Sequence, residues 1–324
     1  MERLKKNLVL GLGLGVAVYL VLALVSDLGG LEVALAGFDY LLIPAILGLV
    51  AVSYMVRFVR WVYYLGLLKV RMPIGINVAI FAAGLSMTIS PGKLGEVLKS
   101  IFIKNVTGVA VARTAPAVVA ERVTDGTGMV AWGLLGALAF SFGPEVLLLF
   151  LTLMATGIAI LRSERISLLA EKILLKVPYL RRLAPHLRDF QGASNQLLAV
   201  RPLIVGTTLS FCSWGLEILG VYLCVTGIGA GTPFLVAVFI FVVSSLVGAS
   251  TMLPGGIGAA EAGMAGMFGA VAGLSTGLSV ALTLVIRLAT LWFATLIGVV
   301  GLLLMRRLVG EHPEAAVAEA EHEP

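Results

Sequence analysis

Charged side chains are scarce in this chain of 324 residues, where aspartate, glutamate, lysine and arginine make up only 13% of the sequence. In a typical soluble domain, charged residues make up about a quarter of the sequence. Apolar residues make up 59% of the positions, and the mean hydropathy is +1.05. Several apolar runs exceed the roughly 18–20 residues needed to cross a bilayer. The sequence therefore excludes an ordinary soluble domain and predicts an all-α polytopic membrane protein.

Cysteine and histidine are rare as well, with two and three residues. Cys212 and Cys224 fall in one expected helix, where a rise of about 1.5 Å per residue places them roughly 18 Å apart, too far for a disulfide. The histidines stand in a loop and in the C-terminal tail rather than in a cluster of ligands. We therefore expect no metal site.

Signals for nucleic-acid binding and for catalysis are also missing. The net charge of +5 comes from residues at the ends of apolar segments, without a basic stripe interleaved with aromatic residues. The sequence contains no nucleophile–base pair, phosphate-binding glycine loop or Gly-x-Ser-x-Gly elbow. We therefore expect no nucleic-acid partner, no catalytic residue and no cofactor, and predict that the protein is not an enzyme.

What the sequence does contain is apolar segments long enough to span a membrane. Six of them predict spanning helices, at residues 8–25, 41–68, 115–140, 145–161, 203–226 and 277–305.

Two further apolar stretches, 74–104 and 234–271, are interrupted by proline and glycine. Proline removes a backbone donor and glycine permits unusual dihedral angles, so each stretch predicts two half-helices joined by a turn. Such a broken backbone is tolerated in a membrane when protein or a water-filled cavity surrounds it. We therefore predict two re-entrant helical hairpins. Their turn residues are Pro91, Gly92, Gly95, Pro254, Gly255, Gly256 and Gly258.

The distribution of basic residues predicts the threading. With a cytoplasmic N-terminus, the loops expected outside (26–40, 141–144, 227–233 and 272–276) contain no lysine or arginine. We therefore expect a multi-pass protein of the cell membrane with both termini in the cytoplasm. The basic segment 162–201 is then cytoplasmic, either as a surface that attracts anionic lipid or as an ordinary positive-inside loop. The acidic tail 311–324 predicts disorder.

The threading predicts an inverted-topology repeat within a membrane domain at 1–310. Span, hairpin and span occur at 41–140 and again at 203–305, with the two hairpins entering from opposite sides. Transporters built in this way bind their substrates at the repeat interface near the middle of the membrane. The spacing from Glu96 to Arg122 is 26 residues, and that from Glu261 to Arg287 is also 26.

Ionisable residues at membrane depth each cost at least about 2.5–3.5 kcal/mol on insertion scales, so each needs a partner or a role. Arg57 and Lys99 are among them, but we interpret Arg57 as snorkelling near the inner interface. The candidates for substrate binding are Arg60, Glu96, Glu121, Arg122, Asp125, Glu217, Glu261 and Arg287.

Structural roles compete with binding for several candidates. Glu121 is also explained by a structural ion pair, and Glu96 and Glu261 by the dipole at a helix N-terminus. The free amides of the hairpin turns are an alternative site for a phosphate. Glu217 is a possible partner of Arg287 or of Arg60.

The ordered set of motifs resembles a known family. The set comprises Pro91-Gly92-Lys93-Leu94-Gly95-Glu96, then Glu121-Arg122 with Asp125, then Leu253-Pro254-Gly255-Gly256-Ile257-Gly258 with Glu261, then Arg287. It resembles the transmembrane, flippase-like domain of lysylphosphatidylglycerol synthases, over about residues 5–307. In the full-length enzymes a following soluble domain aminoacylates phosphatidylglycerol. We expect a stand-alone membrane domain here, so the resemblance implies lipid translocation rather than synthesis.

These observations favour a flippase or scramblase for an anionic phospholipid or a polyprenyl-linked lipid. One alternative is a proton-coupled secondary transporter of a small solute. Another is a membrane scaffold for a separate glycolipid or aminoacyl-lipid enzyme. The expected partners are a membrane lipid as substrate and, beyond it, a second copy of the chain or a lipid-modifying enzyme.

Overall fold

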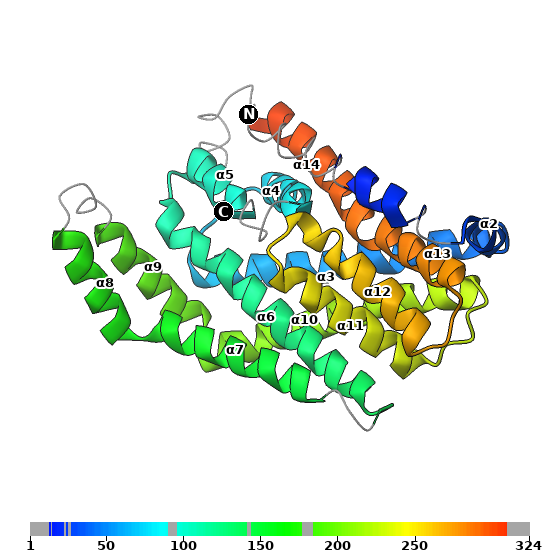
Figure 1. The fold of residues 1–324 in the computed structure, drawn as a ribbon. Coiled ribbons are helices and arrows are strands. Elements are labelled where there is room, and N and C mark those ends of the chain that lie inside the picture. The colour runs from blue at the N-terminus through cyan, green and yellow to red at the C-terminus, as the bar shows by residue number, and fades with distance from the viewer. Residues whose placement is uncertain are drawn as a thin grey trace.

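The computed structural model describes residues 13, 15–22, 24, 27–89, 96–140, 144–176 and 184–309. Within these residues every regular element is a helix and none is a strand, as predicted (Figure 1). The first predicted turn, with Pro91, Gly92 and Gly95, lies outside the described residues, as does the tail 311–324.

Helices of different length alternate along the chain. The longer ones are α3 (Ile43–Leu67), α6 (Val111–Ala137), α7 (Pro144–Arg162), α10 (Val200–Gly227), α11 (Phe234–Ser250) and α14 (Phe293–Val309). The shorter ones are α2 (Leu28–Ala36), α4 (Ile74–Leu85), α5 (Leu98–Thr107), α8 (Glu164–Lys176), α9 (Ala184–Leu197), α12 (Ala259–Ala270) and α13 (Thr276–Arg287). Single turns complete the order: η1 (Tyr40–Leu42), η2 (Ser86–Ile89), η5 (Pro254–Gly256) and the π-helical η6 (Leu288–Trp292).

Three helical stretches in the described ranges are long and apolar enough to cross a membrane. They are Tyr40–Leu67, Val200–Gly227 and Thr276–Met305, which coincide with three of the predicted spans. α6 is also long, but four charged residues interrupt its apolar sequence. The helix predicted at 8–25 is described only in part; there Tyr19 accepts a 2.7 Å hydrogen bond from Trp292.

The second predicted break in the helical backbone lies at Gly255, Gly256 and Gly258. α11 ends at Ser250, the single turn η5 follows, and α12 begins at Ala259 and packs back on α11. Gly255, Gly256 and Gly258 have φ angles of 62°, 65° and 93°, a region that side chains disfavour. The turn therefore depends on glycine at these positions.

The packing of the two halves follows one pattern. α3 packs on α10, α4 packs on α14, and α11 packs on α6 (Figure 1). The first arm of each broken stretch thus lies on the last long helix of the other half, and η2 contacts η5 where the two stretches meet. If each helix is replaced by its counterpart in the other half, the same set of contacts results, as expected for an internal repeat.

Equivalent glycines permit these two close contacts. A Cβ atom on Gly136 of α6 would lie 2.8 Å from the backbone nitrogen of Phe239, and one on Gly301 of α14 would lie 2.4 Å from that of Ala83. Their separation, 301 − 136 = 165, equals the separation of Glu96 and Glu261, 261 − 96 = 165. The two glycines therefore repeat at the same interval as the two glutamates.

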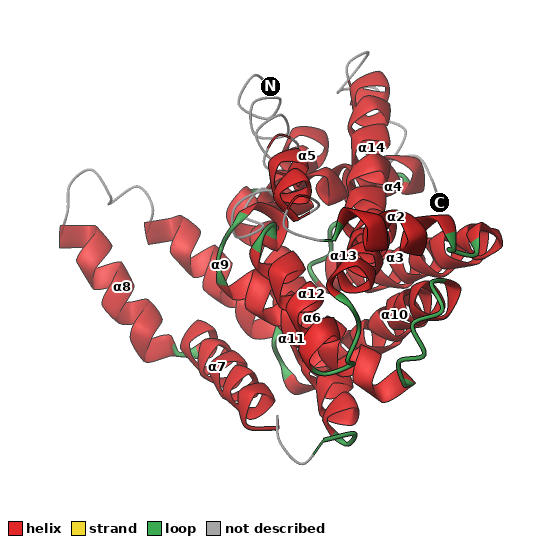
Figure 2. Cartoon of the chain, turned by 45° about the vertical axis from the view of Figure 1, so that its right-hand side comes forward, coloured by secondary structure: helices red, strands yellow, loops and turns green. Residues whose placement is uncertain are grey.

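Helices α7, α8 and α9 lie at one side of the bundle (Figure 2). α7 packs on α6 and α9, whereas α8 packs mainly on α9. α8 leaves Ile166, Leu168 and Leu169 exposed. The basic segment predicted at 162–201 therefore folds for the most part as a helical pair, apart from residues 177–183, which are not described.

Candidate functional site

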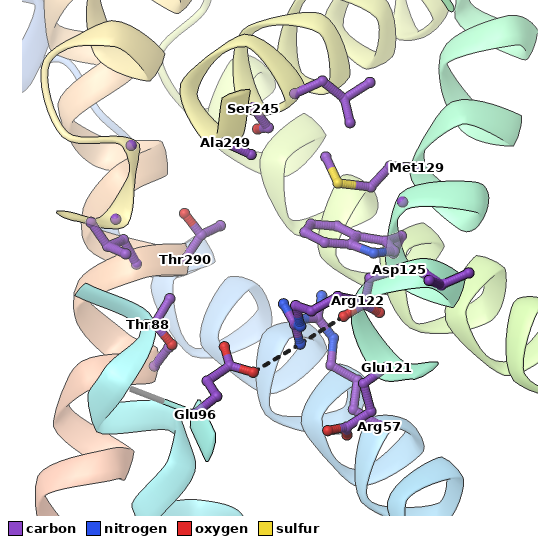
Figure 3. Close-up of a pocket in the computed structure, with 18 of the residues that line it drawn as sticks. Arg57, Thr88, Glu96, Glu121, Arg122, Asp125, Met129, Ser245, Ala249 and Thr290 are labelled. Atoms are coloured by element: carbon purple, nitrogen blue, oxygen red, sulfur yellow. Dashed lines mark ion pairs between the residues drawn. The ribbon is translucent and has the colours of Figure 1, made fainter. Parts of the chain in front are cut away.

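A cavity of about 590 Å³ lies between the two halves. α3, α6 and α10 line one part of it, α7 and α11 another, and residues of both broken stretches complete it. All the candidate binding residues except Glu261 line this cavity, and Glu261 pairs with one that does. Figure 3 shows the ionisable groups gathered in one part of the cavity wall.

Asp125 is the centre of the charge network. Its Oδ1 accepts hydrogen bonds from Arg60 Nη1 at 2.6 Å and from Ser210 Oγ at 2.8 Å. Its Oδ2 lies 2.9 Å from Arg122 Nη2. One carboxylate of α6 therefore joins a cation of α3, a hydroxyl of α10 and a neighbouring cation of α6.

Lys99 and Glu121 form a second ion pair, buried between α5 and α6. The Lys99 ammonium also lies 4.2 Å from the centre of the Trp61 ring and 5.5 Å from that of Phe81, within cation–π range. Two aromatic faces and a carboxylate thus hold this ammonium. The structural interpretation of Glu121 fits this arrangement.

Arg57 and Glu217 form a third pair at 2.6 Å, between α3 and α10. The guanidinium of Arg57 lies 4.3 Å from the centre of the Trp214 ring. Arg57 was expected to snorkel, and Glu217 was expected to pair with Arg60 or Arg287, so the structure corrects both expectations. The sequence feature that could have indicated this pair is the long, mostly apolar character of both helices, because a single charge in such a helix needs a partner.

Arg122 differs from the other cations because its side chain is 33% exposed and faces the cavity. Its Nη2 lies 3.2 Å from Glu96 Oε2, a longer separation than in the pairs of Arg57, Arg60 or Arg287. Figure 3 shows Arg122 between Glu96 and Asp125. Among the described cations of the cavity, Arg122 is thus the most accessible to a ligand.

Arg287 and Glu261 form the equivalent pair of the second half. Arg287 Nε donates to Glu261 Oε1 at 2.6 Å, and its Nη2 donates to the Gly255 carbonyl at 2.8 Å. Glu261 Oε2 accepts from the Gly258 N–H at 2.7 Å, so it caps α12. Both 26-residue spacings in the sequence therefore correspond to ion pairs in the structure.

The amides of the second turn are largely occupied within the turn. Gly256 N–H donates to the Leu253 carbonyl at 2.9 Å, and Ile257 N–H donates to the Pro254 carbonyl at 3.0 Å. Glu261 occupies the Gly258 amide. These amides are thus not available to a phosphate, and Arg122 is the stronger candidate.

The part of the cavity wall formed by α7 and by the turn after α11 is apolar and includes exposed side chains. α7 contributes Phe150, Leu153, Met154 and Leu161, and Met252 and Leu253 follow α11. Leu153 is 59% exposed and Met252 is 65% exposed. The cavity therefore has a charged interior and an apolar mouth between α7 and the turn after α11.

Within the described ranges, no three His, Cys, Asp or Glu side chains form a metal-binding group.

The family profile described as "Lysylphosphatidylglycerol synthase TM region" matches residues 9–298. The chain belongs to this family. All the residues of the charge network lie within the matched range. The chain is therefore a membrane protein of the lysylphosphatidylglycerol synthase transmembrane family, as the sequence motifs predicted.

Several archaeal relatives support this assignment. A UPF0104 membrane protein of Methanothermobacter thermautotrophicus is 28% identical over 309 residues, which cover 88% of this chain and 90% of that protein. One of Pyrococcus horikoshii is 27% identical over 288 residues, covering 80% and 85%. Another from Methanothermobacter is 37% identical over 120 residues, covering 37% of this chain and 35% of that protein. No solved structure matches the chain.

The geometry predicts different costs for losing the two equivalent arginines. Replacing Arg287 by alanine leaves the fully buried Glu261 without its cation, which is expected to destabilise the fold by about 3–5 kcal/mol. Arg122→Ala should cost less, because Arg122 is exposed to the cavity. Thermal unfolding of the purified variants in detergent measures both effects. Equal unfolding temperatures for Arg287→Ala and the wild type would contradict the structural role of this pair.

Proposed function

We propose that this membrane protein moves a phosphate-bearing lipid, either an anionic phospholipid or a polyprenyl-linked lipid, between the two leaflets. The observation that carries the proposal is the division of one cavity into a charged interior and an apolar, exposed mouth. An amphiphile has the same division, with a charged headgroup and hydrocarbon tails.

Arg122 is the headgroup contact in this proposal. A guanidinium binds phosphate through two parallel N–H···O hydrogen bonds, an arrangement that gives both energy and orientation. Arg122 is the most exposed of the paired cations in the cavity, and its pair with Glu96 is the longest. The remaining pairs hold α3, α5, α6 and α10 in place around it.

The apolar mouth favours a lipid over a small soluble solute. Lipid tails stay in hydrocarbon while the headgroup crosses, so a lipid carrier needs a cavity that opens sideways. The exposed side chains of Leu153 and Met252 in the cavity wall support an opening of that kind. A carrier for a soluble solute has no need of exposed apolar side chains at the entrance, and a scaffold has no need of a charged cavity.

The proposed topology has six spans and two re-entrant hairpins, with both termini in the cytoplasm. The contact of η2 with η5 supports it, because hairpins entering from opposite sides must meet within the membrane. Ile89, Ile257 and Leu291 form a small apolar cluster at this junction.

Single cysteines test the topology in a chain whose Cys212 and Cys224 are replaced by alanine. Asn105→Cys, at the exposed end of α5, should react with an impermeant maleimide only from the cytoplasm. Thr276→Cys, at the exposed start of α13, should react only from outside. Reaction of Asn105→Cys from outside would contradict the first re-entrant hairpin.

Reconstituted protein should move a fluorescent phosphatidylglycerol between the leaflets of liposomes. Arg122→Ala should slow this movement about tenfold or more, because a hydrogen bond to a charged group contributes roughly 1.5–3 kcal/mol. Dithionite quenching of the outer leaflet measures the rate. Arg201→Ala, which removes an exposed arginine in the first turn of α10, is the matched control and should leave the rate unchanged.

The outcome separates the proposal from its rivals. Wild-type protein that moves no lipid of an adequate panel, yet accumulates a water-soluble solute under a proton gradient, would contradict lipid transport. Equal rates for Arg122→Ala and the wild type would contradict the assigned role of Arg122.

A further inference from the structure

The carboxylate of Glu96 depends on Arg122 for charge compensation more than the carboxylate of Asp125 does. In the part of the chain that the structure describes, Glu96 forms its ion pair with Arg122, and it is buried. Asp125 is also held by Arg60 and Ser210. If Arg122 turned to another anion, Asp125 would keep two partners, whereas Glu96 would lose the cation beside it.

The neighbouring cations are already committed. Arg57 and Arg60 of α3 pair with Glu217 and Asp125, and Lys99 of α5 pairs with Glu121 of α6. η2 contributes Thr88 to this wall and α11 contributes Ser245 and Ser250, none of which carries a charge. The described residues therefore offer no spare cation to Glu96.

A phosphate on Arg122 would place a second anion close to Glu96. A like charge and a low-dielectric environment both disfavour an ionised carboxylate, and neutralisation by a proton is the ordinary result. The step is the transfer of one proton from a hydronium ion of the solvent to Glu96: an O–H bond of hydronium breaks, the O–H bond of the carboxylic acid forms, and a water molecule is released.

We infer that binding of a phosphate-bearing headgroup at Arg122 is linked to the uptake of one proton by Glu96. The inference rests on the proposed function and adds a coupling ion to it. For a phosphodiester headgroup, which carries one negative charge, the bound phosphate and the added proton together leave the charge of the cavity unchanged. This balance lowers the electrostatic cost of moving the headgroup across hydrocarbon. The equivalent acid of the second half, Glu261, is unsuited to this role, because it is fully buried and held by both Arg287 and the Gly258 amide.

The pH dependence of binding tests the linkage. The probe is a short-chain fluorescent phosphatidylglycerol, titrated into purified wild-type protein between about pH 3.5 and pH 9, a range that begins below the usual pKa of a glutamate, about 4.3, and extends well above it. Binding takes up a proton only in the pH range in which Glu96 is ionised in the free protein and protonated in the lipid complex. In that window Kd should rise about tenfold for each unit of pH, and below it Kd should be constant.

Glu96→Gln supplies the decisive variant, because glutamine resembles the protonated acid in shape and charge. It should bind the probe as tightly at high pH as the wild type does at low pH, with no slope. A merely structural role for Glu96 would lower affinity at every pH and keep the slope. Glu164→Gln, an exposed acid on α8 outside the cavity, is the matched control and should show the wild-type slope.

Each result is decisive. A Kd of the wild type that does not change with pH would mean that another cation neutralises Glu96. A tenfold change of Kd per pH unit in Glu96→Gln would mean that another group takes up the proton. Either result overturns the inference and leaves the proposed lipid transport unaffected. Absence of lipid binding at every pH, with folded protein, would instead defeat the proposed function. Inorganic phosphate is the second probe, and binding as tight as that of the lipid would overturn the assignment of the site to a lipid headgroup.

Discussion

A charge buried among apolar helices is stable only when an opposite charge or a set of hydrogen bonds lies beside it. In this protein that requirement determines the arrangement of the interior. The pairs Arg57–Glu217, Arg60–Asp125 and Lys99–Glu121 each join two helices whose contacts are otherwise mostly apolar. These pairs keep charged side chains of α3, α5, α6 and α10 together in the wall of the cavity.

The two halves use the same pair of residues in different ways. Arg287 is 10% exposed and holds a carboxylate and a turn carbonyl, so it fixes the second broken stretch. Arg122 is 33% exposed and lies between two carboxylates, so its ion pairs are easier to exchange. The pair Arg287–Glu261 is therefore the more firmly held of the two, and the pair Arg122–Glu96 is the more accessible.

The sequence predicted local features better than tertiary ones. Apolar length located the three long helical stretches, and Pro254 with its glycines located the second turn, because these signals act within a few residues. The equal spacing of 26 residues indicated a repeat, but the ion pairs Glu96–Arg122 and Glu261–Arg287 that lie at this spacing were not predicted.

What the sequence did not predict depends on register between distant helices. The partner of Glu217 is decided by how α3 lies on α10, and nothing within either helix specifies Arg57 over Arg60. The π-helical turn after Arg287 was likewise not predicted; there Tyr54 of α3 donates to the Thr290 carbonyl at 3.1 Å. Such a turn adds a residue to the helix and shifts the side chains that follow.

The position of a bound lipid tests the central claim most directly. A density map of the protein in lipid nanodiscs should show an elongated ligand in the cavity, with its phosphate about 3 Å from Arg122 and its tails leaving past Leu153 and Met252. A map with lipid confined to the outer surface of the bundle, and only water around Arg122, would contradict it.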